Sequence, residues 1–377
     1  MIPGDALFDA FINANILIIL AYALWCGARF LLDRLGMRDA YDTHLRLLNA
    51  VFLAIVAAPF VLLAAQWGQA ALGGRANLTL SDMVVAYYLN GGFEMSAAEL
   101  ERLVLLRDRM SADVMQAASP WAIAAIAVFV LGFALGLARL VMSVCCLRSI
   151  VHESYPWRRF GRVRLRLSDR TLVPFSTRGL RNFYVVLPAH MLGQGDEAKV
   201  ALAHEFQHIR QGDITWEIVL ELLKPLFFLN PAYHAWKRQV EQLRELSCDA
   251  RVLARGRIGI RAYCETLMSV CQQTLRRDRV FAVAMPKVTL VTAERSGGQG
   301  GLEHRIKTLL SASQNRTPKG AFVLVGLPLV ALILGAAMAI QSPGDWSQDR
   351  LMLSTVVNLE RLDKINSLTT FGVPPGE

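Results

Sequence analysis

The stretch ALAHEFQHIRQGD, residues 201–213, decides how the central part of the chain is interpreted. His204 and His208 stand four residues apart, and Glu205 directly follows the first histidine. On an α-helix both imidazoles lie on nearly the same face and can reach one metal ion, while Glu205 points about 100° away and can approach an open coordination position. The spacing favours a zinc site of the zincin type. Two histidines on the solvated face of an ordinary helix are the alternative.

The residues around this stretch predict a small α+β domain. Residues 162–188 are rich in Val, Phe and Tyr and alternate apolar and polar positions, which predicts two or three short strands. Residues 197–211 have apolar residues at helical spacing, with Asp196 as the predicted N-cap and Gly212 at a C-cap position. Further helices are predicted over residues 234–256 and 260–277.

Two other segments of this region have a different character. Residues 216–236 are apolar but interrupted by Pro225 and Pro231, which predicts a helix that lies against or dips into a bilayer and kinks or ends at the prolines. Residues 285–301 have the composition of a loop.

The composition points to a membrane protein, because 54% of the residues are hydrophobic. A helix of about 20 apolar residues crosses a hydrocarbon core of roughly 30 Å. Four segments meet this requirement, namely residues 11–32, 47–67, 120–140 and 320–341. No basic region precedes the first segment and no small-residue cleavage site ends it, so we expect a retained anchor.

The charge distribution predicts the orientation. Residues 148–319 hold 28 Lys and Arg against 15 Asp and Glu, whereas residues 68–119 hold 4 against 6. By the positive-inside rule, the basic region is cytoplasmic and both termini lie outside the cell's inner membrane. The net charge of +9 then reflects topology and anionic lipid, and no basic motif with interleaved aromatic residues indicates nucleic-acid binding. The six cysteines fall in the spans or in the cytoplasmic part, which argues for a reducing compartment.

Together these patterns predict a mainly α polytopic membrane protein in six parts. The parts are two spans with a short cytoplasmic loop (1–67), an extracytoplasmic loop (68–119), a third span (120–147), a cytoplasmic domain in the long third loop (148–319), a fourth span (320–341) and an extracytoplasmic tail (342–377). Gly132 and Gly136 form Gly-x-x-x-Gly in the third span, which permits close packing within one subunit or in a homodimer.

A catalytic zinc needs a third protein ligand besides the two histidines. The downstream candidates are Asp213, Glu217, His234, Glu241, Glu245 and Asp249. Asp213 and Glu217 follow the motif helix so closely that they reach back to its zinc-facing side with difficulty. The last three are spaced by four residues, so they share one face of a later helix that can pack against the motif helix. Spacing alone leaves the choice among them open.

Four segments together resemble a known family. ALAHEFQHIRQGD, FFLNPAYHAW, RELSCDARVL and RAYCETL are similar to the bacterial membrane zinc metallopeptidases that include the beta-lactam sensor-transducers of the BlaR and MecR type. The similarity covers residues 167–310, and the four-span arrangement is also similar. About 36 residues follow the last span, without Ser-x-x-Lys, so we expect no penicillin-binding sensor domain in this chain.

The resemblance implies a gluzincin-type site. It implies Zn²⁺ held by His204, His208 and Glu245, with Asp249 as an outer carboxylate that orients an imidazole. Glu241 as the ligand, and Asp249 as a salt-bridge partner of Arg251 or another arginine, are the alternatives.

The same resemblance implies a zinc metalloendopeptidase in which Glu205 acts as general base and acid. It also indicates the strand with Tyr184, Val185 and Val186 as an edge that binds an extended substrate, although a strand that only supports the core is the alternative.

The expected substrate is a cytoplasmic or membrane-proximal protein, such as a repressor. The chain itself is a second expected substrate. Self-cleavage is expected in the loop-like segment that contains Met285 and Arg295. Two other functions stay open: a zinc-binding signalling scaffold without proteolysis, and a housekeeping protease of the membrane.

Overall fold

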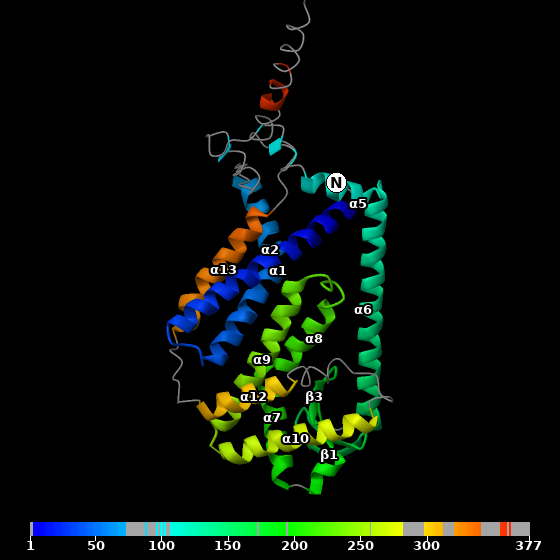
Figure 1. Ribbon diagram of the computed structural model, residues 1–377, viewed down its shortest axis with the longest axis vertical. Helices are drawn as coiled ribbons and strands as arrows, with labels where there is room; N and C mark the ends of the chain where they lie inside the picture. The colour runs from blue at the N-terminus through cyan, green and yellow to red at the C-terminus, as the bar shows by residue number, and fades with distance from the viewer. Residues whose placement is uncertain are drawn as a thin grey trace, which may run out of the picture. The chain divides into compact units, whose positions relative to one another are not determined.

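The computed structural model describes residues 3–72, 87–88, 96, 99–100, 102, 106–171, 173–193, 195–256, 258–281, 298–311, 320–340, 355–359 and 362. These residues are mainly helical, with one small sheet (Figure 1). The chain divides into two compact units, Met1–Leu24 with Ala50–Phe129 and Gly326–Glu377, and Trp25–Asn49 with Val130–Val325. Every side chain of the site described below belongs to the second unit.

Among the described residues, four helices have the length and apolar composition needed to cross a membrane. The candidate spans are Phe8–Arg34 in α1 (Pro3–Arg34), Tyr41–Val61 in α2 (Tyr41–Leu72), the whole of α6 (Pro120–Glu153), and Phe322–Ala339 in α13 (Ala321–Ala339). This confirms the four apolar helices predicted from the sequence. The third helix differs in length, because α6 continues past residue 140 to Glu153. A short helix, α5 (Leu106–Met115), lies between α2 and α6 along the chain.

A four-stranded sheet follows α6. Its strands are β1 (Tyr155–Phe160), β2 (Val163–Ser168), β3 (Phe175–Arg178) and β4 (Phe183–Pro188), in the spatial order β1-β2-β4-β3. β2 and β4 are parallel, and the two outer pairs are antiparallel. The sequence predicted two or three strands and missed β1, whose side chains are all exposed and therefore show no apolar alternation.

β4 is an interior strand of this sheet. Val185 pairs with Leu165 of β2 on one side and with Ser176 of β3 on the other, and both Val185 and Val186 are fully buried. The backbone hydrogen-bonding groups of β4 therefore face neighbouring strands. The prediction that Tyr184, Val185 and Val186 form a free edge is wrong, and the open edges of the sheet belong to β1 and β3.

The motif helix α7 spans Gly195–Gln211 and follows a short 3-10 helix, η1 (Ala189–Gly193). It begins one residue before Asp196, so Asp196 lies inside the helix and is not its N-cap. Gly212 adopts a left-handed conformation, with φ 78°, which glycine reaches at little cost, and α8 (Asp213–Leu223) starts at the next residue. The predicted end of the motif helix at Gly212 is confirmed.

α9 (Pro231–Leu253) begins where the sequence places a proline break. The Asn230 side chain accepts hydrogen bonds from the backbone N–H groups of Ala232 and Tyr233, at 3.0 and 3.2 Å, and Pro231 occupies the first turn. This is the capping chemistry that a helix start needs.

α10 (Ile260–Phe281) and α12 (Gly298–Ser311) complete the second unit. α12 was not predicted, and its first residues contradict the loop expected up to residue 301. Side chains from α7, α9, α10 and α12 share one core, formed by Val200, Cys248, Val252, Tyr263, Cys264 and Leu309. This core fixes the four helices that supply the side chains of the site.

Candidate metal centre

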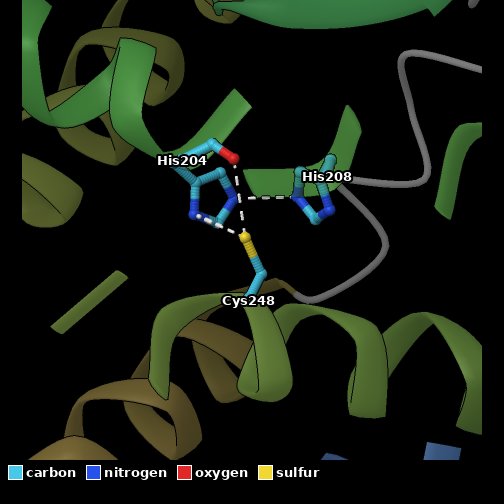
Figure 2. Close-up of side chains that lie close together, drawn as sticks. All are labelled: His204, His208 and Cys248. Atoms are coloured by element: carbon cyan, nitrogen blue, oxygen red, sulfur yellow. Dashed lines mark hydrogen bonds between the residues drawn. The ribbon is translucent and has the colours of Figure 1, made fainter. Parts of the chain in front are cut away.

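The two motif histidines lie with their rings nearly perpendicular, at 88°, and point one ring nitrogen at each other (Figure 2). The Nε2 atoms of His204 and His208 are 3.0 Å apart, and both side chains are buried on α7. One helical turn separates them, as the sequence spacing predicts.

Glu245 of α9 brings a carboxylate to this pair. Its Oε2 lies 3.5 Å from Nε2 of His204, and its Oε1 lies 3.6 Å from Nε2 of His208. A tetrahedral zinc ion with bonds of about 2.0–2.1 Å separates its ligand atoms by roughly 3.3 Å. The three groups therefore fit one zinc ion, and the distances match the ligand set that the resemblance implies.

Cys248 is a second potential ligand, which sequence reasoning did not single out. His204, His208 and Cys248 each place one potential ligand atom within 4.8 Å of the others. However, the sulfur lies 3.5 Å from Nδ1 of His204, which is not the ring nitrogen that faces His208 (Figure 2). Because the two Nε2 atoms face each other and Glu245 faces both, the geometry favours the carboxylate over the thiol.

Hydrogen bonds on the Nδ1 side hold each imidazole in place. Nδ1 of His208 lies 2.9 Å from the Asp213 carboxylate, and Nδ1 of His204 lies 2.9 Å from the Tyr263 hydroxyl and 3.3 Å from Asp249. Such outer contacts fix the ring orientation and leave Nε2 for a metal ion. Asp213 is thus a partner of a histidine, as is Asp249, whose position agrees with the role that the resemblance implies.

Tyr263 links the site to α10. Its hydroxyl donates a 2.6 Å hydrogen bond to Asp249, and burial raises the pKa of this hydroxyl, so it stays protonated. The residue belongs to the RAYCETL segment, but no spacing rule gives it a role.

Arg305 of α12 supplies the cation of the site. Its guanidinium donates two hydrogen bonds to Asp249, at 2.8 and 2.7 Å, and lies 3.0 Å from Oε2 of Glu245. Burial alone would raise the pKa of Asp249, but the charge of Arg305 together with the hydrogen bonds to His204 and Arg305 outweighs burial and lowers that pKa to about 2. On Glu245, the charge of Arg305 and the contacts with the two imidazoles likewise act against burial, and the pKa falls well below its usual range. Both carboxylates are therefore ionised.

Glu205 is buried beside His204 on α7. Its Oε2 has no hydrogen-bond partner among the residues that the structure describes. A buried carboxylate oxygen without a partner is costly, and water or a substrate group would satisfy it. This is the condition expected of a carboxylate that exchanges protons with a reacting group.

The other candidate ligands lie elsewhere. Glu217 pairs with Arg244 at 2.9 Å, and Glu241 pairs with Lys237. His234 uses its Nε2 to contact the backbone oxygen of Phe228 at 2.9 Å.

The arginine proposed as an alternative partner of Asp249 is also engaged elsewhere, because Arg251 pairs with Asp42. Asp249 instead forms its ion pair with a different arginine, Arg305, and it also contacts His204. The position of Asp249 therefore agrees with both expectations, the pair with another arginine and the contact with an imidazole. Met285 and Arg295, the residues of the expected self-cleavage segment, lie outside the described residues.

Comparison with known proteins agrees with this site. No curated protein matches the chain. Residues 110–295 match the model of the BlaR1 peptidase M56 family, and the matched segment contains α6, the sheet, both motif histidines, Glu245 and Tyr263. The motif and this match agree in relating residues 110–295 to the BlaR1 peptidase M56 family.

Proposed function

We propose that the chain is a zinc metalloendopeptidase of the bacterial inner membrane that cleaves a cytoplasmic or membrane-proximal regulatory protein. The observation that carries this proposal is the set of three donor groups, from His204, His208 and Glu245, at mutual distances of 3.0–3.6 Å. Glu205, with a free buried oxygen on the same helix, completes the constellation.

In the proposed reaction the chain's own residues hold the metal and move a proton. His204, His208 and Glu245 bind Zn²⁺, which when bound activates water and polarises the scissile carbonyl. Oε2 of Glu205 accepts a proton from the attacking water and delivers it to the leaving amine. Asp213 and Asp249 keep the imidazoles oriented through their Nδ1 atoms.

The topology is part of the proposal. The excess of basic residues over 148–319 supports a cytoplasmic protease domain, with both termini on the outer side and the six-part division given above. The substrate is then a protein or peptide inside the cell, and the bilayer is the second partner. Proteolysis of a regulator, as part of transmembrane signalling, agrees with an inward-facing site.

Self-cleavage within the segment that contains Met285 and Arg295 is also proposed. α12 begins at Gly298 and supplies Arg305, so a cut before α12 would divide the site between two fragments. Intact-mass measurement of the purified chain tests this: a break in residues 285–297 is expected in the wild type and not in Glu205→Gln. An uncut wild-type chain that cleaves other proteins would contradict self-cleavage.

The test of the main proposal separates metal binding from proteolysis. Glu205→Gln should keep one zinc ion per chain and lose cleavage, because the amide cannot accept a proton. His204→Ala should lose the zinc ion. Asp196→Asn is a matched control, since Asp196 is an exposed acid on the same helix that pairs with Lys199.

Zinc is measured by elemental analysis of the purified full-length chain, and cleavage by the proteins that accumulate in cells carrying each variant. Full cleavage by Glu205→Gln would remove Glu205 from the mechanism and favour the signalling scaffold or another catalytic group. Unchanged zinc content in His204→Ala would overturn the site.

A further inference from the structure

The helix α8 buries acidic side chains and exposes large apolar ones. Asp213 and Glu221 are buried together with Ile214 and Leu220, whereas Ile218 and Leu222 are exposed. A helix on the surface of a soluble domain turns its charged face to solvent and its apolar stripe to the core. The pattern of α8 is the one expected where the surroundings are apolar.

The buried charges of α8 are compensated by α9. Glu217 lies 2.9 Å from Arg244, and Glu221 lies 2.8 Å from Lys237, which also binds Glu241. The later residue of α8 pairs with the earlier residue of α9, and the earlier one with the later, so the two helices run antiparallel as a hairpin. Charged side chains at membrane depth face the interior of a helical bundle and pair with one another.

Contacts with α6 show how far the hairpin reaches. A Cβ at Gly132 would overlap the ring of Phe228, and a Cβ at Gly136 would lie 3.2 Å from Cα of Pro225. The α8–α9 connection of the same chain thus packs closely against these two glycines. This assigns the Gly-x-x-x-Gly of α6 to packing within one subunit.

The position of these glycines sets the depth of the connection. α6 has 34 residues and is about 51 Å long at 1.5 Å per residue, with Gly136 close to its midpoint. The hydrocarbon core is roughly 30 Å thick, so it includes the middle of such a helix wherever the helix sits along its axis. Pro225 therefore lies at the depth of the acyl chains.

We infer that α8, the connection and the first turns of α9 form a re-entrant hairpin, whose exposed Ile218, Leu222 and Leu229 contact lipid acyl chains. The first exposed residues of α9 after Pro231 are polar. Arg238 and Gln242 follow Pro231 by 7 and 11 residues, which corresponds to about 10–17 Å of helix. The outer face of α9 thus becomes polar within two to three turns, as a hairpin that enters and leaves through the same surface requires.

The hairpin also constrains the substrate, an extension that rests on the proposed function. Asp213, the first residue of α8, binds His208. The 11 residues of α8 span about 16 Å, so the zinc site lies within that distance of the embedded connection. A scissile bond must therefore come close to the membrane surface, which favours membrane-proximal segments of substrate proteins.

Site-specific photo-cross-linking in the full-length chain tests the hairpin directly. A genetically encoded benzophenone amino acid replaces Leu222 or Leu229, each 63% exposed. Leu131, 62% exposed on α6, calibrates the yield for a membrane span, and Leu180, 99% exposed between β3 and β4, is the water-facing control. All four side chains are exposed, so the probe disturbs no core.

The chain is reconstituted in vesicles of phosphatidylcholine and phosphatidylglycerol and illuminated, and the mass of the intact chain is then measured by mass spectrometry. The inference expects the mass of one lipid to be added at positions 222 and 229 with a yield comparable to position 131, and no addition at position 180. Yields at 222 and 229 that match position 180, or a cross-linked dimer in place of the lipid adduct, would overturn it. The Glu205→Gln variant should give the same lipid adducts, because the hairpin does not depend on proteolysis. The test of the hairpin and the test of the protease proposal can therefore fail independently.

Discussion

Arg305 offers the sharpest test of how the site is held together. Arg305→Met removes the guanidinium but keeps most of the side-chain volume. Asp249 is fully buried, and the side chains of Arg305 and Glu245 are 18% and 14% exposed, so the variant leaves two ionised carboxylates without their cation. Removing one partner of a buried ion pair costs about 3–5 kcal/mol. For a domain of this size each kcal/mol lowers Tm by about 2–4 °C, so we expect a decrease of roughly 6–20 °C.

The assay is thermal unfolding of the full-length chain in detergent with a zinc chelator, so that metal loss does not contribute. Lys307→Met is the matched control, because Lys307 lies on the same helix, is 73% exposed and pairs with the exposed Glu303. Exposed pairs of this kind contribute about 0–1 kcal/mol. Arg305→Lys keeps the charge but loses the pair of hydrogen bonds to Asp249. Its Tm should therefore lie between the Tm values of Arg305→Met and Lys307→Met. A Tm for Arg305→Met equal to that of Lys307→Met would refute the reasoning.

Three further predictions concern neighbouring residues. Tyr263→Phe removes the hydroxyl between the first motif histidine and Asp249, so zinc affinity in a chelator competition should fall about 10–100-fold; an unchanged Kd would show that the hydroxyl does not support the site. Cys248→Ala should keep one zinc ion per chain and Glu245→Ala should lose it, and the reverse result would make the thiol the third ligand. Asn230→Ala removes the cap of α9 and should lower Tm by about 2–4 °C, for a loss of about 1 kcal/mol, while Asn230→Ser, which keeps a neutral capping oxygen, should lower it less.

The elements that could be predicted from the sequence are those whose signal is local. Four apolar helices, the end of α7 at Gly212 and the interruption of the apolar segment at Pro231 each depend on residues within one or two turns, whereas the helix expected from residue 234 begins at Pro231. The length of an apolar segment, a glycine with positive φ and a proline that follows a capping residue each determine the backbone conformation at their own position. These predictions were confirmed for that reason.

The elements that were missed are defined by their partners in other elements of the chain. β1 has six exposed side chains, so only its pairing with β2 defines it as a strand. The interior position of β4 follows from its pairing with β2 on one side and β3 on the other, which no pattern within β4 reveals. The role of α12 has the same origin, because its contacts with α9 are made by Arg305, 56 residues beyond Asp249.

The choice of the third ligand shows where local reasoning ends. Glu241, Glu245 and Asp249 share one face of α9, as their spacing predicts, yet each has a different partner. α8 brings Glu221 to Lys237 of α9, which also pairs with Glu241. α7 brings the two imidazoles to Glu245, and α12 brings Arg305 to Asp249 and Glu245. Periodicity selects the face of the helix, because it depends only on residues per turn. The level along that face is set by three other helices, so tertiary packing makes Glu245 the carboxylate that meets both Nε2 atoms.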